Sequence, residues 1–191
     1  LVIGAEKMSA IVNYEDRATC PIFGDGAAGV LLEATEEPYG LMDEILCSDG
    51  EGVKHLHQVA GGSVKPASHE TVDAREHFIY QEGQAVFKWA VVKMAEATET
   101  ILQRNDLTSE DISFLLPHQA NMRIIKATGS RLGLDEDKVL INIEKYGNTT
   151  SATIPMLMYE NQNRFKKGDN LILTSFGAGF TWGAIWLKWA I

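Results

Sequence analysis

A short apolar run that ends in Pro117 and His118 is the feature that most constrains the fold of this chain. Residues 112–116 are typical of a buried strand, the proline stops that strand, and a helical pattern begins near Asn121. In open α/β sheets, a strand that ends in a polar residue at the start of a helix marks the edge where chemistry takes place. The sequence therefore predicts a sheet edge that carries His118.

Two further segments have the same character. Residues 146–151, with Asn148 inside them, separate an expected strand from an expected helix. Residues 175–180 form a glycine-rich turn between two apolar strands. We expect these three edges to meet and to form one site.

Hydrophobic periodicity predicts strands and helices in alternation along the chain. Helices are expected over residues 82–103, 121–132 and 150–165, and the apolar stripe of the first is typical of core packing. Strands are expected over residues 1–5 (buried), 30–34, 39–47, 112–116, 139–143, 171–175 and 182–189, with loops over 6–19 and 48–73. The glycine-rich residues 23–29 lack the context of a phosphate cradle, so close backbone packing is favoured there. This order implies a layered α/β protein with a mixed or parallel sheet.

Charge and cysteine content narrow the class of protein. The chain has 17 Lys and Arg against 26 Asp and Glu, a net charge of -9, which argues against broad nucleic-acid binding. Cys20 and Cys47 have neither disulfide nor metal spacing, so a reducing, cytoplasmic setting is expected. His55 and His57 lack a further ligand at a usual offset, so no metal is expected and both are interpreted as solvent-facing.

The C-terminal end of the chain is a long apolar run, and the N-terminal end starts within an expected strand. Residues 171–191 are long enough to cross a bilayer, but Gly177, Gly179 and Gly183 interrupt them. Two strands joined by a glycine turn are therefore favoured, and no membrane partner is expected. The chain has no initiator methionine and opens inside an expected strand, so we expect further residues upstream in a longer protein.

The three edges suggest one kind of chemistry. Taken singly, His118 is more often structural, and Asn148 is equally well a helix N-cap. Taken together, a neutral imidazole and a carboxamide form two donors that stabilise an oxyanion or enolate. The turn around Ala178 offers backbone N–H groups for a second oxyanion. Neither Cys20 nor Cys47 has a visible activating neighbour, so no nucleophile is evident.

Four segments closely resemble the beta-ketoacyl-acyl carrier protein synthase III family, and the resemblance runs essentially end to end. They are residues 16–20 with 23–27, 116–123, 146–152 and 176–183. The resemblance implies a layered α/β/α thiolase fold of two similar halves, and usually a homodimer. Residues 1–38 then match the last strands of the N-terminal half, and residues 39–191 match the C-terminal half. The segment that carries the family's nucleophilic cysteine has no counterpart here, which implies that the chain alone is inactive.

The same resemblance implies an acyltransferase of fatty acid synthesis initiation. A short acyl-CoA and malonyl-acyl carrier protein would be joined by a decarboxylating Claisen condensation, with coenzyme A thioester as substrate and no further cofactor. His118 and Asn148 match the enolate-holding pair, and the backbone N–H of Ala178 matches an oxyanion donor. Substrate-binding positions are matched by Arg17, Gly83, Gln84, Asn121 and Phe176, and carrier-protein docking positions by Lys88, Arg123, Lys126 and Arg131. A local basic patch on an acidic chain suits an acidic partner, although Lys126 and Arg131 are equally consistent with a solvated helix face.

Two alternatives stay open. One is another thiolase-fold enzyme, of the polyketide synthase or hydroxymethylglutaryl-CoA synthase type. The other is a silent fragment that only binds acyl-CoA or assembles. The residue types at positions 118–121 and 147–151 favour the condensing enzyme of fatty acid synthesis.

Overall fold

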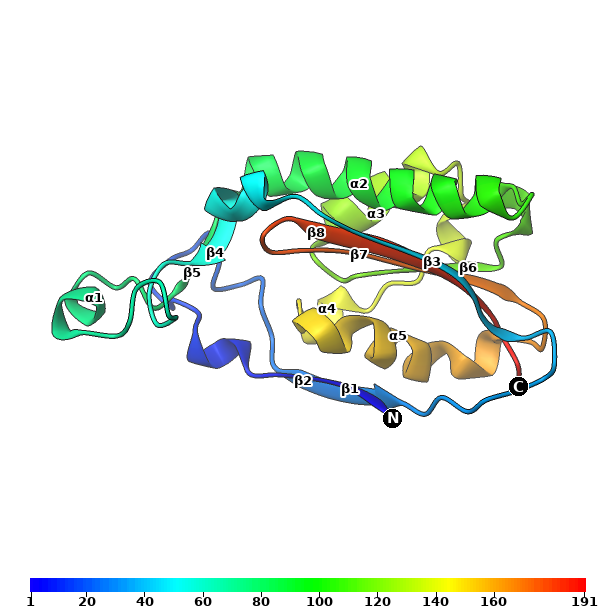
Figure 1. The fold of residues 1–191 in the computed structure, drawn as a ribbon, viewed down its shortest axis with the longest axis horizontal. Coiled ribbons are helices and arrows are strands. Elements are labelled where there is room, and N and C mark those ends of the chain that lie inside the picture. Colours follow the sequence, from blue (N-terminus) through cyan, green and yellow to red (C-terminus); the bar gives the residue numbers. More distant parts are fainter.

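The structure, a computed structural model, describes residues 1–191 as a four-stranded sheet with helices on both faces (Figure 1). The strands are β1 (Val2–Glu6), β2 (Gly26–Val30), β3 (Gly40–Ser48), β4 (Leu56–Gln58), β5 (Ile79–Gln81), β6 (Phe114–Pro117), β7 (Asn170–Gly177) and β8 (Thr181–Lys188). The helices are α1 (His69–Asp73), α2 (Gly83–Arg104), α3 (Met122–Arg131), α4 (Ile143–Tyr146) and α5 (Thr153–Asn161). The alternation of strands and helices that the sequence predicts is confirmed.

The main sheet has the strand order β3-β8-β7-β6. β6 runs parallel to β7, and Pro117 lies beside Thr174. β7 and β8 form an antiparallel hairpin that closes at Gly177 and Thr181. Because β6 and β7 are parallel, their carboxyl ends lie at the same edge of the sheet. His118 and the glycine turn therefore start from neighbouring strands at one edge.

The layers of the fold follow from which faces are apolar. α2 and α3 cover one face of the sheet, α5 covers the other, and the β1–β2 ribbon lies beyond α5 (Figure 1). One core cluster joins α2 and α3 to the sheet through Ile101, Ile125 and Ile172. Another, which includes Leu116 and Leu157, joins the sheet to α5. The layered α/β/α arrangement is thus confirmed.

α2 is long because its apolar residues recur at helical spacing. Val86, Ala90, Met94, Ala97 and Ile101 are all buried, on the side that faces the sheet and α3. This stripe is core packing, as expected.

The closing hairpin confirms the interpretation of the C-terminal segment. β7 and β8 pair over eight residues each, and the turn between them contains Gly179 at φ +90°. Glycine adopts this left-handed conformation without the steric cost that a Cβ would bring. None of the helices is both long enough and apolar enough to cross a membrane.

Three expected strands differ from those observed. Residues 139–143 do not form a strand: Val139 makes one isolated bridge to Leu115, and α4 begins at Ile143. The strand expected over residues 30–34 lies earlier in the chain, since β2 ends at Val30 and residues 31–34 have no regular structure. Strand β1 exists, but only Gly4 in it is buried: Val2, Ile3 and Ala5 are exposed, and Glu6 is half-buried where it accepts from the Ser151 hydroxyl. Apolar character alone predicted burial there wrongly.

The glycine-rich segment is closely packed, as predicted. A Cβ on Gly24 would lie 2.1 Å from the Tyr146 carbonyl oxygen, and one on Gly26 would lie 2.9 Å from the Met156 sulfur. The expected loop over residues 48–73 also contains β4 and α1, which project to one side with β5 (Figure 1). His55 and His57 are half-buried rather than solvent-facing, and His55 pairs with Glu82.

Residues 31–39 have no regular structure and connect the β1–β2 ribbon to β3. The boundary between residues 38 and 39, which the resemblance implies, falls within this connection. It stays a prediction.

Candidate functional site

His118 is held at the carboxyl end of β6. Its backbone N–H donates to the Thr174 carbonyl at 2.8 Å, which continues the β6–β7 ladder by one residue. Its Nδ1 lies 2.7 Å from the Thr153 hydroxyl at the start of α5, and no residue of the chain bonds its Nε2. The ring is therefore oriented by one nitrogen and free to bind a ligand with the other.

Burial lowers the pKa of His118 from 6.5 to about 4. The residue is only 8% exposed, and desolvation disfavours the charged imidazolium. The imidazole is therefore neutral across the physiological pH range. A neutral ring can donate a hydrogen bond from only one nitrogen.

The Thr153 hydroxyl decides which nitrogen that is. It lies within hydrogen-bonding distance of both the Thr150 carbonyl, at 3.0 Å, and His118 Nδ1. A hydroxyl has a single proton to donate. When that proton points to Nδ1, the ring proton sits on Nε2 and faces the open side. Thr153 thus controls whether His118 is a donor at the site, and sequence reasoning missed it.

Asn148 is fixed by its backbone and by its own side-chain oxygen. Its N–H donates to the Ile22 carbonyl at 2.8 Å, and its carbonyl accepts from Gly24 at 3.0 Å. Its Oδ1 accepts from the Thr150 N–H at 2.9 Å. The side-chain NH₂ has no partner within the chain and remains a free donor, although Asn148 is 8% exposed.

The two residues are joined by a short chain of polar contacts. Asn148 Oδ1 accepts from the Thr150 N–H, and the Thr153 hydroxyl lies between the Thr150 carbonyl and His118 Nδ1. That hydroxyl donates to the carbonyl when the ring proton is on Nδ1, and donates to Nδ1 when the ring proton is on Nε2. Thr150 is held in this connection at φ +46°, which is uncommon for a residue other than glycine. The predicted sheet edges that carry His118 and Asn148 are therefore brought together around Thr150 and Thr153.

The glycine turn is anchored by an aromatic cluster. Phe180 is 1% exposed, and its ring lies 4.8 Å from Phe176 and 5.5 Å from Trp89, centroid to centroid. Gly52 packs so closely that a Cβ there would lie 2.1 Å from the Phe180 ring. Ala178, by contrast, is exposed, and its N–H takes part in none of the turn and loop hydrogen bonds. The turn is thus anchored by the packing of Phe180, while its backbone donor at Ala178 stays open.

A cavity of about 670 Å³ lies beside these elements. Its lining comes from three segments far apart in the sequence: Ala18 and Ile22; Gln81, Gly83, Gln84 and Phe87; and Asn121, Met122 and Arg123. Three of the expected substrate-binding residues, Gly83, Gln84 and Asn121, thus line one pocket. The exposed Arg17 precedes the lining residue Ala18, whereas Phe176 belongs to the aromatic cluster and not to this lining.

The four expected docking residues are all exposed. Lys88 lies on α2, and Arg123, Lys126 and Arg131 lie on α3, which packs against α2. None of the four forms an ion pair within the chain. Arg123 also lines the cavity, where its guanidinium lies 5.0 Å above the Phe87 ring. The positive charge therefore begins at the pocket and continues along α3.

Neither cysteine is joined to this arrangement. Both Cys20 and Cys47 are free and half-buried, and neither is hydrogen-bonded to His118 or Asn148. Cys47 lies in β3, where it pairs with Trp182. Nowhere in the chain do three or more His, Cys, Asp or Glu residues gather as metal ligands would.

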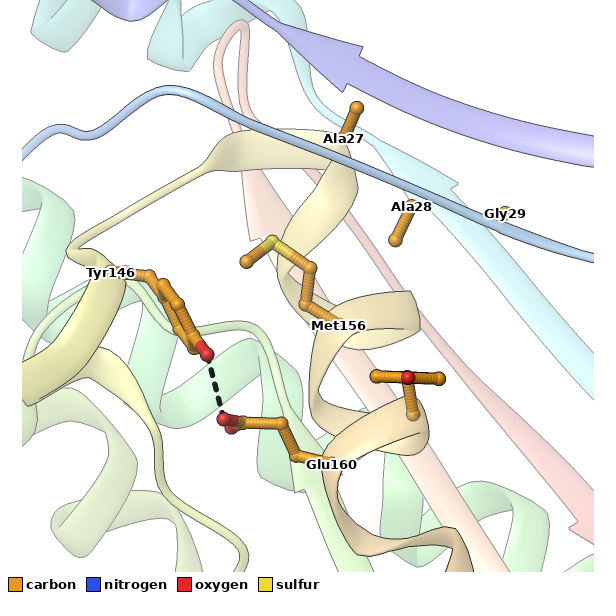
Figure 2. A pocket seen from close by; sticks show the side chains of 7 residues that line it. Ala27, Ala28, Gly29, Tyr146, Met156 and Glu160 are labelled. Atoms are coloured by element: carbon orange, nitrogen blue, oxygen red, sulfur yellow. Dashed lines mark hydrogen bonds between the residues drawn. The ribbon is translucent and has the colours of Figure 1, made fainter.

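A second hollow, of about 390 Å³, lies between β2 and α5 (Figure 2). The carboxylate of Glu160 is its one charged group. Tyr146 donates to this carboxylate at 2.7 Å, and Asn142 and Lys145 donate to it at 2.9 and 3.0 Å. These bonds lower the pKa of Glu160 against the opposing effect of burial, which is the largest single contribution. A carboxylate already bonded three times braces α4 against α5 and is not free for a ligand.

Comparison with known proteins matches this chain to one family by two models. Residues 1–50 match "3-Oxoacyl-[acyl-carrier-protein (ACP)] synthase III", and residues 102–189 match its "C terminal" model. Beta-ketoacyl-[acyl-carrier-protein] synthase III of Porphyromonas gingivalis is 59% identical over 190 residues. The protein of the same name from Phocaeicola vulgatus is 56% identical over 189 residues.

The fold gives the same result. The crystal structure of beta-ketoacyl-[acyl carrier protein] synthase III from Thermus thermophilus matches 98% of this chain with a TM-score of 0.88 and 39% identity, and the match covers 58% of that protein. The alignments to the two curated relatives cover 100% and 99% of this chain. The chain spans 57% of the length of each of those relatives.

Proposed function

We propose, because the chain belongs to the 3-oxoacyl-[acyl-carrier-protein] synthase III family, that the protein it forms part of joins an acyl-CoA to malonyl-acyl carrier protein. The reaction is a decarboxylating condensation that yields a 3-oxoacyl-acyl carrier protein. The observation that carries the proposal is a pair of polar groups without a partner in the chain, His118 Nε2 and the Asn148 NH₂, which contacts through Thr150 and Thr153 hold together.

These two donors suit the decarboxylation step. The bond between the malonyl carboxylate and the α-carbon breaks, carbon dioxide leaves, and the electron pair moves into the thioester to form an enolate. Negative charge thereby develops on the thioester oxygen. His118, with its proton on Nε2, and Asn148 each donate to that oxygen, and a fixed donor in a buried site contributes about 3 kcal/mol to the barrier reduction.

The glycine turn suits the condensation step. The enolate carbon attacks the carbonyl of an acyl group held as a thioester, and the oxyanion that forms accepts from the Ala178 N–H. The tetrahedral intermediate then collapses and expels a thiolate. We assign the acyl-carrying thiol to a cysteine other than Cys20 and Cys47, since neither is joined to the donor pair. On this proposal the 191-residue chain does not condense substrates by itself.

The cavity and the basic face suit the two substrates. An elongated thioester arm fits the 670 Å³ cavity that Gly83, Gln84 and Asn121 line, with Arg17 at its border. The exposed charges of Lys88, Arg123, Lys126 and Arg131 suit an acidic carrier protein on an otherwise acidic chain. We further propose that the protein acts in the cytoplasm as a homodimer and needs no cofactor beyond the coenzyme A thioester.

The proposal is tested on the full-length protein with His118→Ala and Asn148→Ala. Each change should lower the rate of condensation by about 10²- to 10³-fold while the enzyme is still acylated by acyl-CoA, because the donors act only on the malonyl group. A wild-type protein that is indifferent to malonyl-acyl carrier protein would refute the proposal in favour of another thiolase-fold enzyme. A protein that binds acyl-CoA without any turnover would point to a silent binding protein.

The docking surface is tested by charge reversal. Lys126→Glu should raise the KM for malonyl-acyl carrier protein at least several-fold and leave the KM for malonyl-CoA unchanged. Lys166→Glu is the matched control, because Lys166 is also exposed and precedes β7 at the opposite end of that strand from the site. Equal effects of the two changes would mean that α3 has no special part in docking.

A further inference from the structure

Gln119 has a role that the sequence motif does not reveal. It follows His118 directly and is completely buried, at 0% exposure. A buried glutamine side chain needs partners for two N–H groups and two oxygen lone pairs. Gln119 has all four, and each partner is a backbone group.

The four partners lie on two separate segments. The side-chain nitrogen donates to the Pro117 carbonyl at 2.8 Å and to the Leu140 carbonyl at 3.3 Å. The side-chain oxygen accepts from the N–H groups of Asn142 at 2.9 Å and Ile143 at 3.1 Å. The orientation of the amide is fixed, because a flipped amide would place its NH₂ against two N–H donors.

The second segment leads directly to Asn148. Asn142 and Ile143 begin the single turn of α4, which ends at Tyr146 and is followed by Gly147 and Asn148. N–H groups in the first turn of a helix have no partner within the helix. Gln119 supplies that partner from the loop that carries His118.

The connection continues on the far side of α4. The Asn142 side chain donates to Glu160 on α5, and Glu160 in turn accepts from the Tyr146 hydroxyl (Figure 2). α4 is therefore held at its start by Gln119 and at its end by Glu160. A one-turn helix has little stability of its own, so these side chains set its position.

We propose that Gln119 is a positioning residue that holds the His118 loop and the Asn148 loop in register with each other. This inference rests on the proposed function for its kinetic consequence. It does not make Gln119 a catalytic residue, because all of its polar atoms are occupied by backbone groups. Its substitution should displace Asn148 relative to His118 and so weaken the enolate-holding pair.

Two variants of the full-length protein test the side-chain amide of Gln119: one removes both its nitrogen and its oxygen, and the other replaces only the nitrogen. Gln119→Met keeps the length of the side chain and removes all four hydrogen bonds. We expect it to lower the rate of malonyl-dependent condensation by about 10- to 100-fold, as a displacement of up to 1 Å would. Self-acylation by acyl-CoA, which does not use the enolate pair, should stay within about threefold of wild type.

Gln119→Glu keeps the oxygen that faces Asn142 and Ile143 but places a second oxygen against the Pro117 and Leu140 carbonyls. A protonated carboxyl group can donate to one of those carbonyls, whereas a carboxylate cannot. The condensation rate of this variant should therefore rise as the pH falls, relative to wild type. Gln119→Met should show no such rise.

Ile101→Ala is the control for a general loss of stability. Ile101 is fully buried in α2 and contacts neither loop through a polar group. At a temperature well below its unfolding transition, this variant should keep both half-reactions close to wild type. Amide hydrogen exchange of a peptide over residues 140–146 gives a readout without activity, and protection there should fall in Gln119→Met and not in Ile101→Ala.

A folded Gln119→Met protein that condenses within twofold of wild type would overturn the inference. So would an equal loss of acylation and condensation that Ile101→Ala reproduces. A wild-type protein without condensing activity would instead refute the proposed function. In that case unchanged exchange protection over residues 140–146 in Gln119→Met would overturn the positioning role independently.

Discussion

Substitution of Gly24 by alanine should damage the site without touching any group that acts in it. A Cβ at this position would lie 2.1 Å from the Tyr146 carbonyl oxygen, and real Cβ atoms almost never approach within 3.0 Å. The two segments must therefore separate by roughly 1 Å, since a packed interior transmits strain of this kind. That movement affects the strand-like contact between residues 22–24 and Asn148.

The cost can be worked from the contacts that lie at this position. Overpacking a backbone contact costs about 1–3 kcal/mol. The bonds from Gly24 N–H to the Asn148 carbonyl, 3.0 Å, and from Asn148 N–H to the Ile22 carbonyl, 2.8 Å, would be stretched, at a net cost of about 1 kcal/mol each. We expect the free energy of unfolding to fall by about 3–5 kcal/mol. A 1 Å displacement of Asn148 should lower condensation by about 10²-fold.

Gly50→Ala is the matched control. Nothing lies within 4 Å of a Cβ at Gly50, and the residue opens a short 3₁₀ turn after its cap, Asp49. Alanine there should be neutral or stabilise the protein by up to about 1 kcal/mol through the unfolded state. The assay is urea unfolding of both full-length variants, with condensation measured under native conditions. If Gly24→Ala unfolds and condenses like Gly50→Ala, the contact between residues 22–24 and Asn148 does not position the site.

Three further predictions concern single side chains. Thr153→Val should lower condensation roughly tenfold through loss of one hydrogen bond to His118, whereas Thr153→Ser should retain most of the rate. The buried His118 should make the protein less stable as the pH falls from 6.5 towards 4, because the unfolded state binds a proton at a higher pH than the folded state does. The loss in free energy of unfolding should reach about 3 kcal/mol in full and should be absent above pH 6.5. Urea unfolding of His118→Gln across that range should show no such loss. Lys93→Met should cost about 1 kcal/mol in thermal unfolding, because the ammonium lies 5.6 Å from the Trp89 ring and 5.4 Å from the Trp182 ring, and Glu96→Gln, which removes only an exposed ion pair, should cost less than half as much.

The sequence predicts those parts of the fold that local periodicity determines. The apolar stripe of α2 and the glycine turn between β7 and β8 are each encoded within one short segment, and both were predicted at the right place. The position of His118 at a strand end also follows from local signals, since Pro117 terminates β6 and Asn121 caps α3 through its side-chain oxygen.

The wrong strand at residues 139–143 has a non-local cause. Its apolar residues have the composition of a strand, but the N–H groups of Asn142 and Ile143 donate to the Gln119 side chain instead of to a neighbouring strand. A side chain 23 residues away in the sequence has thus taken the donors that a sheet would need. No periodicity within residues 139–143 contains that information.

The partners of the candidate site residues are hidden from the sequence for the same reason. Thr153 follows Asn148 by five residues in a segment that otherwise reads as the start of a helix, and only the fold brings its hydroxyl to His118. Gln119 lies inside the motif that singles out His118, yet its amide oxygen is bonded to the backbone at the start of α4. The motif therefore combines His118, which has a side-chain nitrogen without a partner, with Gln119, whose polar atoms are all bonded within the protein.

Substitutions at the two kinds of residue should differ in how they affect the rate and the stability of the protein. His118 Nε2 and the Asn148 NH₂ have no partner within the chain, so on the proposed function their loss removes an interaction with the substrate and leaves few protein groups unsatisfied. Gln119 and Glu160 have their polar atoms bonded within the protein, so their loss leaves buried backbone or side-chain groups without partners. Loss of rate with stability nearly retained identifies the first kind of residue, and loss of both identifies the second. Stability and rate measured on the same variants would therefore separate the groups that act on the substrate from those that hold them in place.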